Sequence, residues 1–160
     1  MQLGDRGGRG LRLRQERQGA DGIDMNVLRS QLAHIPSLIE EMLRKDEEIK
    51  ALAATMIHTQ SILYLARGIN YPIALEGALK MKEISYLHAE GHPAGEMKHG
   101  PIALIEKGLP VVVVAPSNDL FEKMSSNIEE VKARGGRIIA LTDAPALLRG
   151  KADDIIEVPA

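Results

Sequence analysis

The chain has 160 residues, of which 44% are hydrophobic, with a formal net charge of −2 and no cysteine. The length suits one domain with extensions. The balanced charge gives no general attraction to nucleic acid or anionic lipid, and the lack of thiols excludes disulfides and a cysteine nucleophile within this chain. The longest apolar run, Leu109 to Pro116, is far below the roughly 18 residues of a membrane-spanning helix. We therefore expect a cytoplasmic protein with an aliphatic core and with neither nucleic acid nor membrane as partner.

The first segment, Met1 to Asp24, has an unusual composition. It contains six glycines and five arginines but only four large aliphatic side chains, and these follow no helical or strand pattern. Such a segment cannot bury enough apolar surface to offset the entropy of ordering it. An arginine- and glycine-rich tract can also bind RNA, but its four acidic residues and its lack of aromatic residues favour a disordered extension over residues 1–24.

The next segment is predicted to be helical. Apolar residues recur at helical spacing from Met25 onward, Pro36 is predicted to start a second helix, and a third is expected to begin at Asp46. We interpret residues 25–52 as a helical linker. It precedes a domain over residues 53–160, which we expect to be truncated at its C-terminal end.

Residues 53–160 alternate between short apolar runs and amphipathic segments. Strands are predicted at 61–66, 87–91, 110–115, 137–141 and 154–158, and helices at 71–86 and 119–134. This alternation predicts an α/β fold: a three-layer α/β/α sandwich around a five-stranded parallel sheet, as in flavodoxin-like proteins. The unbroken apolar run Val111–Ala115 is predicted to be the central strand, because it needs cover on both faces.

Ligands of parallel sheets bind at the carboxyl ends of the strands. Here these ends carry Arg67, a loop rich in glycine, proline and histidine, and the Ser117-Asn118 pair. Neither a GxGxxG nor a Walker pattern occurs, so there is no sign of a phosphate cradle. Ser117 and Asn118 are more simply interpreted as caps of the following helix.

Glu76, Lys80 and Glu83 lie at positions i, i+4 and i+7 of the helix predicted at 71–86, so they share one face. One interpretation is a solvated row of ion pairs. The other is a buried acid–base group that faces a ligand crevice, since this helix is apolar nearly all round and such helices are mostly buried. The residues alone do not decide between the two.

His88, His92 and His99 fall within twelve residues of one another and raise the possibility of a metal site. Their spacing would suit one face of a helix, but the intervening glycines and proline break any helix there, and no carboxylate completes a zinc pattern. We therefore expect no metal and no cofactor. His99, which follows Lys98, is either a catalytic loop imidazole or a histidine bonded to the backbone.

Several stretches closely resemble the second sugar-isomerase (SIS) domain of the glutamine–fructose-6-phosphate aminotransferases (isomerising), also called glucosamine-6-phosphate synthases. The resemblance runs from about Leu32 to Pro159. It implies a SIS-type fold and, in the complete enzyme, a homodimer. The stretches that carry it are Arg67-Gly68, Ala74–Tyr86, His88–Pro101, Val111–Asp119 and Asn127–Gly136.

The resemblance also implies roles for single residues. Glu83 would be the base that moves a proton between C1 and C2 of fructose 6-phosphate, and Lys80 would assist that transfer. His99, supplied by the neighbouring subunit, would promote opening of the sugar ring. The remaining candidates, Arg67, Glu76 and Lys98, are predicted to bind the substrate.

Other parts of the family's enzyme have no counterpart in this sequence. These are the glutaminase domain, the first SIS domain with its phosphate loop, and the C-terminal tail with its imine-forming lysine. The resemblance therefore implies an isomerase-domain fragment of an enzyme that makes glucosamine 6-phosphate and glutamate. The alternative is a lone SIS module that binds a phosphosugar without transforming it.

Overall fold

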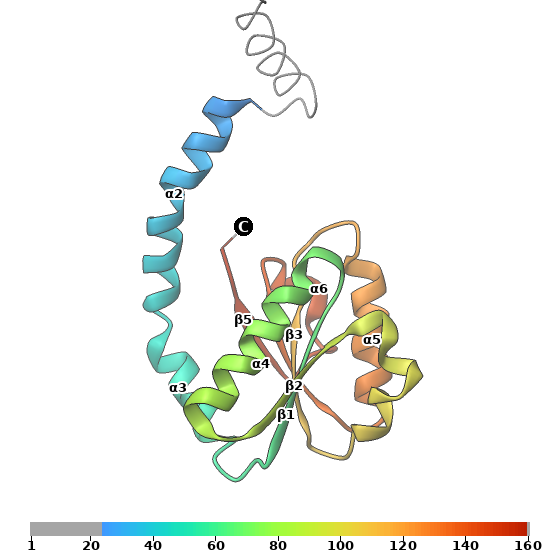
Figure 1. The fold of residues 1–160 in the computed structure, drawn as a ribbon. Coiled ribbons are helices and arrows are strands. Elements are labelled where there is room, and N and C mark those ends of the chain that lie inside the picture. The colour runs from blue at the N-terminus through green and yellow to red at the C-terminus, as the bar shows by residue number, and fades with distance from the viewer. Residues whose placement is uncertain (1–23, 160) are drawn as a thin grey trace, which may run out of the picture. The chain divides into compact units, whose positions relative to one another are not determined.

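The computed structural model describes residues 24–159 (Figure 1). The predicted disordered extension therefore lies, apart from Asp24, outside the described residues. Contacts divide the chain into two compact units with the boundary between Glu41 and Met42. Within residues 24–159, no helix combines the length and the apolar character that a membrane crossing requires.

The first described helix, α2, spans Met25–Leu43 without interruption. The prediction that Pro36 starts a separate helix is wrong, because Pro36 lies inside α2. The φ angle of proline fits a helix, and its missing N–H removes only one backbone hydrogen bond, so the helix can continue past it. A second helix, α3 (Asp46–Ala54), follows and begins with three acidic residues, which favour a helix N-terminus.

Five parallel strands form one sheet in the order β2-β1-β3-β4-β5. The predicted five-stranded parallel sheet is thus confirmed, and β3 lies at its centre. Val112 and Val113 of this strand are 8% and 0% exposed, as the unbroken apolar run requires. The strands are β1 (Ser61–Ala66), β2 (His88–Pro93), β3 (Pro110–Val114), β4 (Arg137–Thr142) and β5 (Asp154–Glu157).

The remaining helices lie on the two faces of this sheet. The α-helices are α4 (Tyr71–Ser85), α5 (Phe121–Ala133) and α6 (Pro145–Leu148), and the 3-10 helices are η1 (Gly68–Asn70), η2 (Ala94–His99) and η3 (Pro101–Leu104). Along β1, Ile62 and Tyr64 pack with α4 and with Leu52 of α3 on one face, whereas Leu63 and Leu65 pack with α5, α6 and η2 on the other (Figure 1). This is the predicted three-layer sandwich.

Glycine follows the end of α5, the helix that packs on the second face. Gly135 has a φ of +89°, which L-residues rarely adopt, and its N–H donates to the carbonyl of Lys132. A Cβ at this position would lie 3.2 Å from the Cα of Lys107, so the backbone of two loops approaches closely here.

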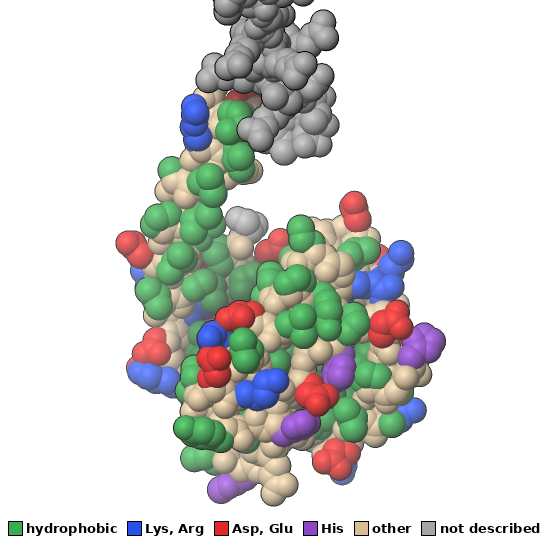
Figure 2. Space-filling model, viewed as in Figure 1, with side chains coloured by type: hydrophobic (Ala, Val, Ile, Leu, Met, Phe, Trp, Pro, Cys, Tyr) green, Lys and Arg blue, Asp and Glu red, His purple; other side chains and the backbone are tan. Residues whose placement is uncertain are grey.

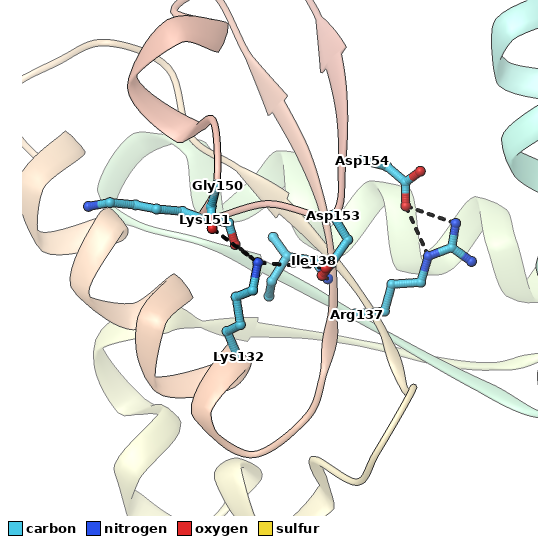
Figure 3. A network of polar contacts seen from close by, with 7 residues as sticks. All are labelled: Lys132, Arg137, Ile138, Gly150, Lys151, Asp153 and Asp154. Atoms are coloured by element: carbon cyan, nitrogen blue, oxygen red, sulfur yellow. Dashed lines mark hydrogen bonds and ion pairs between the residues drawn. The ribbon is translucent and has the colours of Figure 1, made fainter.

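A polar network fixes the amino ends of β4 and β5 (Figure 3). Arg137 pairs with Asp154 through two nitrogens at 2.9 and 2.8 Å, and the N–H of Ile138 donates to Asp153 at 2.8 Å. Lys132 of α5 donates to the carbonyls of the preceding turn at Gly150 and Lys151. These contacts lie at the opposite end of the strands from their carboxyl ends, so we assign them to stability.

Candidate functional site

The order in which strands are added to the sheet changes direction between β1 and β3, although all the strands are parallel. From β1 the chain adds β2 on one side, and from β3 it adds β4 and β5 on the other. The carboxyl ends of β1 and β3 therefore border the crevice in which open α/β sheets bind ligands. Here the crevice is nearly filled: a cavity of about 10 Å³ remains, lined by Arg67 and Asn70 after β1 and by Pro116 and Asn118 after β3. Side chains such as Phe121 of α5 close it from the side.

Arg67 lies at this crevice, as its place after the first strand predicts. Its Nη1 donates to the side-chain oxygen of Asn127 on α5 at 3.1 Å. A Cβ at Gly95, near the start of η2, would lie 3.2 to 3.3 Å from the guanidinium. The guanidinium is therefore held between α5 and η2. The bond to Asn127 uses only one of its five N–H donors.

Glu76, Lys80 and Glu83 form a row of ion pairs on α4. The Lys80 Nζ lies 2.7 Å from Glu83 Oε2 and 3.7 Å from Glu76 Oε1. The hydrogen bond and the charge of Glu83, and to a lesser degree the charge of Glu76, raise the pKa of Lys80. The lysine is therefore a fixed cation beside a carboxylate, which can stabilise negative charge on that carboxylate or on a ligand.

Of the two interpretations of this row, the structure of this chain taken alone shows the first, a solvated row of ion pairs. Within the helix only Ala74 and Ala78 are buried, and the side chains of Lys80 and Glu83 are 52% and 51% exposed. The two residues face solvent rather than a closed crevice. Charged and apolar side chains lie next to one another over α4 (Figure 2). The exposed apolar residues are Ile73, Leu75, Leu79, Ile84 and Tyr86.

The candidates of the glycine- and histidine-rich segment lie on η2. Met97, 1% exposed, anchors this short helix in the core. Lys98 pairs with Glu130 of α5 at 2.9 Å, and its side chain is 65% exposed. His99 is 73% exposed, with its Nε2 3.9 Å from Glu96. Lys98 thus has a structural partner, while the imidazole of His99 projects from the surface.

The structure does not bring all six candidates together within one chain. Glu76, Lys80 and Glu83 share α4 on one face of the sheet. Lys98 and His99 belong to η2, which packs on the other face. Arg67 lies at the end of β1 between these layers. A site that uses both sets would need one of them from a second molecule or domain.

Sequence reasoning missed a contact between two strand ends. The backbone N–H and the hydroxyl of Ser117 donate to the two carboxylate oxygens of Asp143 at 2.6 and 2.7 Å. Asn118 does not cap α5 as predicted: its side chain accepts the N–H of Leu120 at 2.9 Å, but Leu120 is itself the N-cap of α5, which has no side-chain cap. Ser117 instead links the loops after β3 and β4, which are adjacent strands. This contact depends on β3 and β4 being neighbours in the sheet, which the local sequence does not determine.

A second missed cluster lies on β2. His88 and His92 contact the two oxygens of Glu90 at 3.3 and 3.1 Å. Alternate residues of a strand share a face, so the signal was present in the spacing 88, 90, 92. In the part of the chain that the structure describes, no three such side chains are arranged to hold a metal ion.

Comparison with known proteins identifies the family. The family model for the SIS domain matches residues 55–156. The chain belongs to the SIS domain family. Its fold superposes on the C-terminal domain of glucosamine-fructose-6-phosphate aminotransferase from Francisella tularensis with a TM-score of 0.77 and 43% identity, covering 82% of this chain and 37% of that one.

The SIS domain described here is also similar to longer curated proteins. It is 53% identical over 129 residues to glutamine–fructose-6-phosphate aminotransferase (isomerising) of Aquifex aeolicus, and 55% identical over 129 residues to the Escherichia coli protein of the same name. Each match covers 80% of this chain, but only 22% and 21% of those proteins. The chain thus spans about a fifth of the length of these relatives.

Proposed function

We propose that this SIS domain supplies the sugar-isomerising part of a glutamine–fructose-6-phosphate aminotransferase, with fructose 6-phosphate as substrate and glucosamine 6-phosphate as product. We place this activity in the cytoplasm. The observation that carries the proposal is the 53% to 55% identity to two proteins of that name over 129 residues. The ion-paired base and ammonium on α4 support it further.

The chemistry that we assign to α4 is a proton transfer. Converting a 2-ketose into an aldose moves one proton from C1 to C2 and a second from the C1 hydroxyl to the oxygen on C2; a single carboxylate can accept the first from C1 and return it at C2. We assign this role to Glu83. We expect Lys80, 2.7 Å from Glu83, to stabilise the negative charge that develops on the C2 oxygen when the C1 proton leaves.

We assign binding and ring opening to the other candidates. The remaining donors of Arg67 at the strand end suit sugar oxygens, and Glu76 and Lys98 would complete the binding group. His99 would open the sugar ring from a neighbouring subunit of a homodimer. Its exposure and its place on the opposite face from Glu83 support a role in trans, because one chain cannot unite the two residues.

Domain replacement tests this function. Residues 32–159 of this chain would replace the matching region of the Escherichia coli relative, and glucosamine 6-phosphate formation from fructose 6-phosphate and glutamine would be measured. We expect the hybrid to keep activity. A well-folded hybrid that hydrolyses glutamine yet makes no amino sugar would contradict the proposal.

The second candidate function is phosphosugar binding without catalysis. The half-exposed state of Lys80 and Glu83 argues against catalysis by the chain acting alone, because a general base works best when it is shielded from water. We expect the purified chain to bind fructose 6-phosphate with a Kd on the order of millimolar or weaker, and to form no product with added ammonium. Calorimetric titration and a product assay check this. Micromolar affinity without product would favour the binding module, and product would show that one chain suffices.

A further inference from the structure

Two side chains of α5 hold the segment that contains η2 and η3, which runs beside this helix (Figure 1). Glu130 pairs with Lys98 of η2 at 2.9 Å, and Arg134, at the C-terminal end of α5, donates to the carbonyl of Ile102 of η3 at 3.3 Å. Residues four apart lie on the same side of a helix. Short 3-10 helices have poor internal hydrogen bonds, so contacts of this kind decide how they lie. Neither Glu130 nor Arg134 is among the candidates derived from the sequence.

Two neighbours determine the direction in which His99 projects. A 3-10 helix has three residues per turn, so Met97, Lys98 and His99 point about 120° apart around η2. Met97 is 1% exposed and lies in the core, which fixes the first direction. The ion pair between Lys98 and Glu130 fixes the second direction, toward α5. The imidazole of His99 therefore takes the third direction, away from both.

The carboxylate of Glu130 is more shielded than that of the residue before it. The Glu130 side chain is 28% exposed, whereas that of Glu129, which pairs with Lys151 at 2.8 Å, is 59% exposed. Glu130 Oε2 is buried, and no group within residues 24–159 donates a hydrogen bond to it. A buried carboxylate oxygen without a donor lowers stability. Stability alone therefore does not account for a carboxylate at this position, whereas an anchor for Lys98 does.

We propose that Glu130 is a positioning residue for ring opening: by holding Lys98 it fixes the rotation of η2 and aims the imidazole of His99 at the sugar. This inference rests on the ring opening assigned to His99 above. Opening breaks the bond between C2 and the ring oxygen. A proton is added to that oxygen, which becomes the C5 hydroxyl, and a proton leaves the C2 hydroxyl, which becomes the carbonyl. One imidazole can donate the first proton and accept the second only if it is aimed at both oxygens.

Backbone 15N relaxation of the full chain tests the positioning without any substrate. We expect Glu130→Met to lower the order parameter of the His99 amide from about 0.85 to about 0.6 or less. The denaturation midpoint should not fall, because the substitution removes a partly buried charge. The matched control is Glu129→Met, which removes the exposed pair with Lys151 and should leave the His99 amide unchanged. An unaltered order parameter of His99 in Glu130→Met would overturn the proposal.

The second test uses the hybrid with the Escherichia coli relative and two sugars. The analogue 5-deoxyfructose 6-phosphate lacks the hydroxyl that closes the ring, so it needs no ring opening. We expect Glu130→Met to lower kcat/KM for fructose 6-phosphate by about tenfold, and to leave kcat/KM for the analogue and glutamine hydrolysis unchanged. In a Lys98→Gln hybrid, Glu130→Met should have no further effect, because it acts through Lys98.

The outcomes separate this inference from the proposed function. An equal loss with both sugars, or a tenfold loss that persists in the Lys98→Gln hybrid, would show that Glu130 does not act through Lys98 on ring opening. An unmutated hybrid without amino-sugar formation would contradict the proposed function instead. The relaxation of His99 in the full chain would then still decide whether Glu130 positions it.

Discussion

Lys80 and Glu83 form a 2.7 Å ion pair within one turn of α4, yet each side chain keeps about half of its surface exposed. Exposed ion pairs contribute little to stability. We therefore expect Glu83→Gln to leave the denaturation midpoint of the chain unchanged within error. The matched comparison is Asp154→Asn, which breaks the contacts of a carboxylate 32% exposed with Arg137 and should lower the midpoint clearly. A large loss of stability in Glu83→Gln would show that the pair is structural.

The core on the α5 side of the sheet should be sensitive to loss of volume. Leu65 of β1 is 0% exposed, so we expect Leu65→Ala to lower the free energy of unfolding by about 2–5 kcal/mol. Leu147→Ala provides the control, because Leu147 is 54% exposed and its loss should change stability by no more than about 0.5 kcal/mol. Urea denaturation followed by circular dichroism measures both. Equal effects of the two substitutions would contradict the described core.

Two effects of adding a Cβ at Gly135, which follows α5, can be measured separately: the strain of its positive φ angle and the contact with the backbone of Lys107. Gly135 and Gly108 have φ angles of +89° and +82°, but only at Gly135 would a Cβ meet a neighbour, the Cα of Lys107 at 3.2 Å. Both alanine variants should lose stability through strain, by about 1 kcal/mol or more. Gly135→Ala should lose more, and thermal denaturation of the two variants would show the difference. A Gly108→Ala variant that is the less stable of the two would refute the explanation.

The Ser117–Asp143 contact should make stability depend on pH. Partial burial alone would raise the pKa of Asp143, but the hydrogen bonds from Ser117 outweigh it and lower the pKa below 3.8. A carboxylate with a lowered folded-state pKa stabilises the fold above its unfolded-state pKa, and this contribution is lost as the pH falls through the folded value. Ser117→Ala should therefore be destabilising at pH 6, and less so below pH 3.8.

Denaturation of Ser117→Ala at several pH values checks this expectation. Ser126→Ala is the control, because the Ser126 hydroxyl donates to the uncharged backbone carbonyl of Glu122. The cost of the control substitution should not vary with pH over the same range. A pH-independent cost for Ser117→Ala would remove the assigned link to Asp143.

The strands could be predicted from sequence because their signals are local. The run at Ser61–Ala66 and the β-branched run from Pro110 need burial on both faces, and each forms a strand of the central part of the sheet. Gly135, just past the end of α5, is a local signal of the same kind, since only a glycine adopts its backbone angle easily. Pro36 misled the prediction because one lost hydrogen bond did not outweigh the rest of α2.

The arrangement of the candidate site could not be predicted in the same way. Local pattern placed Glu83 on a helix and His99 near a strand end, but the face of the sheet that each element covers depends on the connections between distant strands. The apolar outer side of α4 indicated burial, yet Ile73 and Ile84 are exposed in this chain. Such a pattern is typical of a surface that another domain or subunit covers.

The central claim is that Glu83 is the base of a sugar isomerisation, and one measurement addresses it most directly. In the hybrid with the Escherichia coli relative, Glu83→Gln would be assayed for glucosamine 6-phosphate formation and for glutamine hydrolysis, with Glu122→Gln, an exposed glutamate of α5, as control. We predict that Glu83→Gln abolishes amino-sugar formation while glutamine hydrolysis continues, and that the control keeps both activities. Equal loss of both activities, or retention of both, in Glu83→Gln would contradict the claim.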